Sequence, residues 1–139
     1  MAGYSGTPLT AKLGLKAGAL LHVVNAPAGY RKLLAPLPGG ARIATRPTSK
    51  PDIVHHFATR RAELCAALTS YRRKLDVATP VWVSWPKKSA KLPTDITEGT
   101  IRDVALPLGY VDIKVCAVSE IWSALKLVVR KDLRGDNRS

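Results

Sequence analysis

The sequence predicts an α/β protein, a three-layer Rossmann-like sandwich with a mostly parallel sheet of about six strands and a C-terminal antiparallel hairpin. Short apolar runs alternate with longer amphipathic segments, which is typical of strands that are buried on both faces and joined by helices. Two alternating runs close the chain, as expected for a hairpin with one polar face.

The first half of the chain offers two helices and two candidate strands. "GTPLTAKLG" predicts a short helix with Thr7 as its N-cap, Pro8 at its first position and Gly14 after its end. The apolar run 19–25 predicts the first strand, and the leucine spacing of "AGYRKLLAPL" predicts a second helix. Residues 41–46 are a candidate strand whose place in the sheet stays open, because the following link is short for a parallel crossover.

The second half supplies the centre of the predicted sheet and its closing hairpin. The apolar runs 52–57 and 80–85 are expected to be buried strands, separated by a long helix that begins at Thr59. A further helix is expected around "IRDVALPLG", and residues 110–118 and 123–131 form the hairpin.

Composition narrows the class of protein. The chain has 139 residues, of which 46% are hydrophobic, so it is long enough to bury one core. We expect one domain over residues 1–131 and a flexible basic tail over 132–139. A net charge of +12 favours anionic partners. No signal peptide or membrane-length apolar run is evident, so we expect a cytoplasmic protein without a membrane partner.

The carboxyl ends of parallel strands meet at one edge of the sheet, where ligands of such folds bind. The residues expected at this edge are Asn25, Thr59, Arg60, Arg61, Ser84, Trp85, Lys87 and Lys88. Arginines at the start of a helix oppose its dipole unless an anion lies nearby. The lysines would add charge and Trp85 a stacking face. The sequence therefore predicts a site for an anionic or phosphate-bearing small molecule.

Each of these features also has a plain structural interpretation. Trp82 and Trp85 are separated by an odd number of positions, so they point to opposite faces of a strand and cannot form one aromatic platform. Trp82 is expected in the core, Trp85 is either packing or a ligand contact, and the lysines after it could be a solvated loop. His55 and His56 have no metal-ligand spacing, and we expect at least one histidine to be buried and neutral.

Recognisable catalytic motifs are absent from the sequence. Ser84 lacks the glycines of a nucleophile elbow, and no HExxH, paired Cys/His or Walker loop is found. Cys65 and Cys116 lie far apart and form no redox or metal motif. We therefore predict no catalytic residue, metal or cofactor, and lean towards a protein that is not an enzyme.

Longer strings of the sequence resemble known families. Residues 52–131, with the order strand, helix, strand, helix and hairpin, resemble the second half of a class I methyltransferase. A resemblance over nearly the whole chain is to a small bacterial family, domain of unknown function 3052. It is carried by "MAGYSGTPL", "VNAPAGY", "FATRRAEL", "WVSWPKK", "RDVALPLG" and "WSALKLVVRK". This second resemblance implies no assigned activity.

Two departures from the methyltransferase pattern disfavour S-adenosylmethionine. The turn from Asn25 to Gly29 has one glycine and a proline, where a glycine-rich turn would let the backbone approach the cofactor. The run 41–46 ends in Thr45 and Arg46, where an acidic residue would hold the ribose hydroxyls. We therefore expect a non-catalytic, Rossmann-like binding module.

Two other functions stay open at this point. A basic nucleic-acid-associated protein would use the long helix from Arg60 to Lys74 and would bind with a steep salt dependence. A degenerate methyltransferase would act through a protein partner. Trp122, at the expected hairpin turn, could then make a homodimer contact.

Overall fold

The computed structural model describes residues 7–48 and 50–134. Its strands are β1 (Leu20–Val24), β2 (Arg42–Ala44), β3 (Ile53–Phe57), β4 (Val81–Pro86), β5 (Tyr110–Ala117) and β6 (Trp122–Val129). Its helices are α1 (Leu9–Leu13), α2 (Tyr30–Leu34), α3 (Arg61–Lys74), α4 (Glu98–Ala105) and α5 (Lys131–Arg134), with 3-10 turns η1 (Lys88–Ala90) and η2 (Leu106–Leu108). No helix in these two ranges is long and apolar enough to span a membrane.

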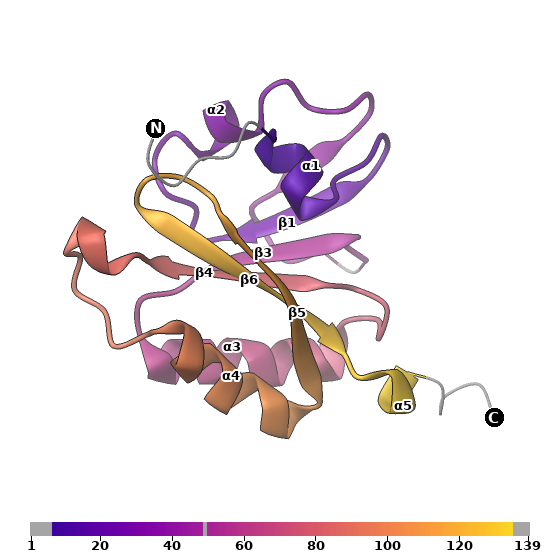
Figure 1. Ribbon diagram of the computed structural model, residues 1–139. Helices are drawn as coiled ribbons and strands as arrows, with labels where there is room; N and C mark the ends of the chain where they lie inside the picture. The colour runs from indigo at the N-terminus through magenta and orange to yellow at the C-terminus, as the bar shows by residue number, and fades with distance from the viewer. Residues whose placement is uncertain (1–6, 49, 135–139) are drawn as a thin grey trace.

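The strands form one six-stranded sheet in the order β2-β1-β3-β4-β6-β5 (Figure 1). β2, β1, β3 and β4 are parallel, whereas β6 runs antiparallel to β4 and β5 antiparallel to β6. The predicted fold class and closing hairpin are confirmed. β2 pairs with β1, with Ile43 opposite Leu21, so the stretch that the sequence left open does join the sheet.

The strand order reverses at β1. The chain leaves β1 for β2 on one side and then returns to β3 on the other side. Connections that diverge in this way leave a crevice above the carboxyl ends of the two central strands. The candidate site should therefore lie where β1 and β3 end.

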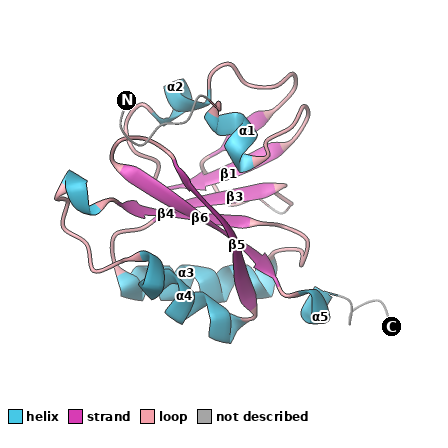
Figure 2. Ribbon diagram, viewed as in Figure 1, coloured by secondary structure: helices cyan, strands magenta, loops and turns pink. Residues whose placement is uncertain are grey.

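Helices cover both faces of the sheet, α1 and α2 on one and α3 and α4 on the other (Figure 2). The alternation along β4 sends Trp82 and Trp85 into different cores. Trp82 is fully buried with Leu9 and Leu13 of α1, and its Nε1 donates to the Leu13 carbonyl at 3.2 Å. Trp85 lies with Leu64 in the core under α3 and α4. The predicted opposite orientation of the two tryptophans, and the place of Trp82 in the core, are confirmed.

Helix termini differ from the predictions by a few residues. The N-cap of α1 is Pro8 rather than Thr7. α2 ends at Leu34, because Ala35 precedes a proline and such residues are driven to extended backbone. The long helix begins at Arg61 rather than at Thr59, whose carbonyl instead accepts hydrogen bonds from the segment before α4.

The C-terminal segment begins with a short helix. Residues 131–134, which include the start of the predicted tail, form α5, and its Leu133 packs against the α3/α4 core. The remainder of the predicted tail, residues 135–139, lies outside the described residues.

Candidate functional site

A cavity of about 190 Å³ lies at the carboxyl ends of β1 and β3, and its lining residues are Asn25, Phe57, Thr59, Arg60, Glu63 and Trp122. Asn25 directly follows β1 and adopts a left-handed conformation with φ of 60°. Asparagine tolerates this conformation better than most residues. Its side-chain amide donates to the Phe57 carbonyl at 3.2 Å and so links the ends of the two strands. This cavity therefore occupies the switch point of the sheet.

Two aromatic rings form one wall of the cavity. Trp122 is the first residue of β6 and is half-buried, and its ring meets the Phe57 ring edge to face with the centroids 5.0 Å apart. In the sheet Trp122 pairs with Pro86 at the end of β4. The indole is thus held over the end of the sheet, where it presents an apolar surface next to polar groups.

A hydrogen-bonded chain fixes the carboxylate of Glu63 beside the cavity. His56 Nε2 lies 2.8 Å from Glu63 Oε2, and His56 Nδ1 lies 2.7 Å from the Tyr71 hydroxyl. Burial lowers the pKa of His56, although the charge of Glu63 raises it in part. A neutral imidazole that donates to Glu63 and accepts from Tyr71 satisfies every group. Arg60, exposed at the N-cap of α3, provides the opposite charge.

His55 forms a second chain on the other face of β3. Its Nδ1 lies 2.7 Å from the Tyr30 hydroxyl, and its Nε2 lies 2.7 Å from Ser84 Oγ. His55 and Ser84 both have 0% of their surface exposed. Burial lowers the pKa of His55 from 6.5 to about 3, so this histidine is neutral at physiological pH.

The structure brings together three of the residues that the sequence placed in the site: Asn25, Thr59 and Arg60 line the cavity. Ser84 lies beneath it, fully buried and bonded to His55. Trp85 is only 8% exposed and packs among apolar side chains, so its ring offers no stacking face at this edge.

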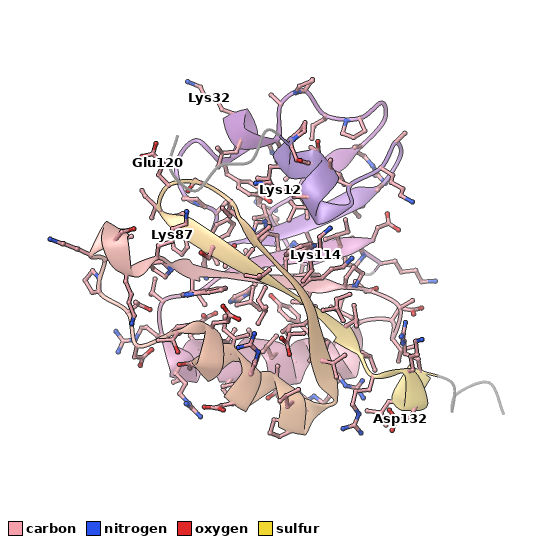
Figure 3. All side chains as sticks on the ribbon, in the orientation of Figure 1. Lys12, Lys32, Lys87, Lys114, Glu120 and Asp132 are labelled. Atoms are coloured by element: carbon pink, nitrogen blue, oxygen red, sulfur yellow. The ribbon has the colours of Figure 1, made fainter. Side chains whose placement is uncertain are left out.

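The predicted cations from the neighbouring loop and helix lie outside the cavity lining. Lys87 follows β4, and its backbone N–H donates to the Ile121 carbonyl at 2.8 Å, which sets it beside the hairpin turn that carries Glu120 (Figure 3). Lys88 is exposed in η1. Arg61 lies in the first turn of α3, and its backbone N–H donates to Asp95 Oδ1 at 2.6 Å.

The Asp95 contact changes the argument for an anion at α3. We expected the arginines there to require an external anion. Asp95, from the segment before α4, supplies a carboxylate to the first turn of α3 within the chain itself. The arginines at the start of α3 are therefore no evidence for a bound anion. The evidence for a ligand comes from the cavity alone.

Sequence reasoning missed three residues of the lining: Phe57, Glu63 and Trp122. Phe57 was assigned only to its strand, and Trp122 was considered only as an exposed interface residue. The position of Glu63 could have been found, because it lies one turn after Arg60 and faces back towards the preceding strand. In the described ranges no group of three or more His, Cys, Asp or Glu side chains could hold a metal ion.

No family model and no curated protein matches the chain, so the resemblance to domain of unknown function 3052 stays an expectation. Solved structures do match it. A SAM-dependent methyltransferase from Aquifex aeolicus has a TM-score of 0.60 and 14% identity over 88% of each chain. The Methanococcus jannaschii fibrillarin pre-rRNA processing protein has a TM-score of 0.59 and 8% identity over 90% of this chain and 70% of its own. The fold is methyltransferase-like.

A third match adds to the same conclusion. A tRNA methyltransferase from Bacillus subtilis has a TM-score of 0.58 and 11% identity, with 92% of this chain and 68% of its own covered. At these identities the likeness concerns the fold alone.

The methyltransferase-like fold implies S-adenosylmethionine, but the residues present do not suit it. A second cavity, of about 290 Å³, lies where β1 and β2 end. Its charged lining residues are Arg31 and Lys32, and Thr45 follows β2 where an acidic residue would hold a ribose. Two cations in the lining would be unfavourable for this cofactor, which carries a net positive charge. We therefore derive no chemistry through it.

Proposed function

We propose that the protein is a non-catalytic, methyltransferase-like module that binds a small anionic molecule in the cavity between the ends of β1 and β3. The observation that carries the proposal is the lining of that cavity. Arg60, the amide of Asn25 and the hydroxyl of Thr59 are grouped around an aromatic wall at the switch point of the sheet. Ligands of open α/β sheets bind at this position, and few polar groups beside an aromatic surface are typical of small-molecule sites.

The charges of the lining narrow the chemistry of the ligand. Among the described residues that line the cavity, Arg60 is the one cation, and a guanidinium pairs well with one carboxylate or one phosphate. Glu63, anchored by His56, would repel a second anionic group. The ligand that fits best therefore has one anionic group for Arg60 and a hydrogen-bond donor or ammonium group for Glu63.

The absence of catalysis in this proposal is supported by the buried serine. Ser84 and His55 are within hydrogen-bonding distance, as a nucleophile and its base would be. Neither side chain has any exposed surface, so a substrate could not reach the hydroxyl without opening the core. This pair is best interpreted as a structural polar contact within the sheet.

A thermal-shift screen tests the proposed ligand class. The purified chain would be tested with amino acids, nucleoside monophosphates, inorganic phosphate and S-adenosylmethionine at low and high salt. A ligand present at about 100 times its Kd should stabilise the folded state by about 2.7 kcal/mol. We expect a salt-tolerant rise in melting temperature for a molecule with one anionic group and one donor.

The test variant is Arg60→Gln, which removes one positive charge at the N-cap of α3. The matched control is Arg73→Gln, which removes one positive charge from an exposed position in the last turn of the same helix. We expect the ligand response to disappear in Arg60→Gln and to persist in Arg73→Gln. An equal response in both variants, or no response to any of these molecules in the unmodified chain, would contradict the proposal.

A further inference from the structure

The positive charge is unevenly distributed along the chain. From residue 1 to residue 51 the sequence has no Asp or Glu. The basic residues of that segment are Lys12, Lys16, Arg31, Lys32, Arg42, Arg46 and Lys50. This segment forms α1, β1, α2 and β2, so one helical layer of the protein is built from a stretch with no carboxylate side chain.

Carboxylates gather in the opposite layer. Those that belong to α3, to α4, to the loop before α4 and to the start of β5 are Glu63, Asp95, Glu98, Asp103 and Asp112. Arg102 forms ion pairs with two of them, Glu98 and Asp112. Basic residues of the α3/α4 layer are thus partly neutralised within the chain, and Arg72 is further occupied by the Leu108 carbonyl at 2.8 Å.

The sheet adds lysines to the carboxylate-free layer. Lys114 of β5 and Lys126 of β6 are direct neighbours across the ladder, and Lys126 also pairs with Trp82 of the α1/α2 core. The Lys126 ammonium lies 5.8 Å from the centre of the Trp82 ring. Like charges that face each other across a sheet are destabilising. Two lysines at this register are therefore an unfavourable pair that a bound anion would relieve.

Lysines of the helices converge on the same side. Lys12 of α1 donates to the Ala117 carbonyl of β5 at 2.9 Å, which holds α1 against the hairpin. A cleft of about 280 Å³ between α1, α2 and the hairpin contains both Lys12 and Lys32. Its other described lining residues are Thr7, Pro8, Leu9, Leu33 and Val118, so none of them is a carboxylate. Figure 3 shows Lys12, Lys32 and Lys114 on the upper and front parts of the molecule.

We propose that the α1/α2 face, defined by Lys12, Arg31, Lys32, Lys114 and Lys126, binds nucleic acid through the phosphate backbone. Its charges are distributed over two helices and two strands, which suits a chain of phosphates better than a single anion. Two carboxylates lie next to the segment 1–51: Glu120, on the hairpin turn (Figure 3), and Asp52, which accepts from the Leu20 N–H at 2.7 Å. The inference does not depend on the small-molecule site.

The kind of binding follows from what the face contains. Tyr30 is the only aromatic residue in α1 or α2, and it is buried, so base stacking on these helices is excluded. Contacts confined to phosphates give affinity without sequence selectivity. An anionic membrane suits the face less well, because three of the four leucines of the two helices, Leu9, Leu13 and Leu34, are buried in the core and Leu33 is half-buried, so little apolar surface can enter lipid.

Fluorescence anisotropy with a short labelled RNA of mixed sequence, titrated at several salt concentrations, tests the inference. The test variant is Arg31→Glu/Lys32→Glu and the matched control is Arg73→Glu/Lys74→Glu. Each replaces two adjacent, exposed basic residues of a helix and changes the net charge equally. We expect the affinity of the test variant to fall at least about tenfold. The slope of the logarithm of the affinity against the logarithm of the salt concentration should become less steep. We expect a change of about 0.7 for each phosphate that the variant no longer neutralises.

The outcomes distinguish binding at the α1/α2 face from binding at α3 and from a general effect of net charge. An equal fall in affinity in both variants would show only a net-charge effect and would overturn the proposal. A fall confined to the control would also overturn it. Vesicles of phosphatidylserine and phosphatidylcholine form a second arm. Binding to these vesicles without measurable binding to RNA would also overturn it. Weaker RNA binding in the test variant alone, with an unchanged melting temperature, is the result that we expect.

Discussion

At the scale of single residues, the two neighbouring histidines His55 and His56 each join β3 to side chains of other elements through hydrogen bonds. The sequence predicted that at least one of the three histidines is buried and neutral. His55 and His56 are adjacent in a strand, so their side chains point to opposite faces. Each is held by a tyrosine and by one further polar group, at distances between 2.7 and 2.8 Å. Strand periodicity could predict their orientation. The partners could not be predicted, because strand periodicity does not reveal which side chains of other elements meet them.

Acid should destabilise the protein through His55. The pKa of this histidine is about 3 in the folded chain and 6.5 when unperturbed, so the unfolded state binds more protons between these values. The stability that the neutral His55 contributes to the folded state is therefore present in full above pH 6.5, and it is lost progressively as the pH falls towards 3. At pH 5 we expect His55 to contribute about 2 kcal/mol less to the free energy of unfolding than at pH 7, measured by urea unfolding of the unmodified chain and of His55→Gln.

His55→Gln is the control for this prediction, because glutamine can hydrogen-bond to Tyr30 and Ser84 but does not titrate. The other two histidines are present in both the unmodified chain and the variant. The difference between their unfolding free energies, followed with pH, therefore reports the contribution of His55. An NMR titration of the unmodified chain tests the same claim without a variant. An imidazole of His55 that titrates near pH 6.5 in the folded protein would contradict it.

At the scale of elements, the start of α3 depends on a residue from another segment. Its N-cap position is Arg60, which makes no side-chain cap. Asp95 takes over that role by accepting from the backbone N–H of Arg61, 34 residues earlier in the chain. The helix that follows Asp95, α4, has a cap of its own: Thr97 forms a capping box with Thr100.

Removal of this contact should weaken the packing of α3 and α4. Asp95→Ala leaves the Arg61 N–H without its acceptor and the arginines of the first turn without a nearby carboxylate, so we expect the unfolding free energy to fall by about 1 kcal/mol. Asp103→Ala removes the same charge from an exposed position of α4 and should change stability by less than half as much. Equal changes in chemical denaturation would indicate a general charge effect and would contradict the assigned cap.

The strands were easier to predict than the sites between them. Continuous apolar runs and the alternation of the last two segments depend on local sequence, and they predicted β1, β3, β4, β5 and β6 to within a few residues, whereas the place of β2 in the sheet stayed open. Residues such as Asn25 and Thr59 were expected at the ligand edge because strand ends determine where they lie. Trp122 reaches the same cavity from β6 only because that strand pairs with β4, and no local pattern reveals such a pairing.

At the scale of the whole molecule, two arrangements bear on the proposed functions. The reversal of strand order at β1 creates the small polar cavity of about 190 Å³ at one edge. The separation of charges places a carboxylate-free layer, α1 with α2, on one side of the sheet and most carboxylates on the other. The first arrangement favours one small ligand, and the second favours an extended anion.

The proposed ligand site can be tested most directly through the three tryptophans, which give three indole N–H signals in a ¹H–¹⁵N spectrum. Trp82 and Trp85 lie in the two cores, whereas Trp122 lines the cavity. Titration with the molecule selected by the thermal screen should move the Trp122 signal saturably and leave the other two in place, with Trp122→Phe providing the assignment. A Trp122 signal that stays still while the ligand binds, or a Trp85 signal that moves instead, would contradict the proposed site.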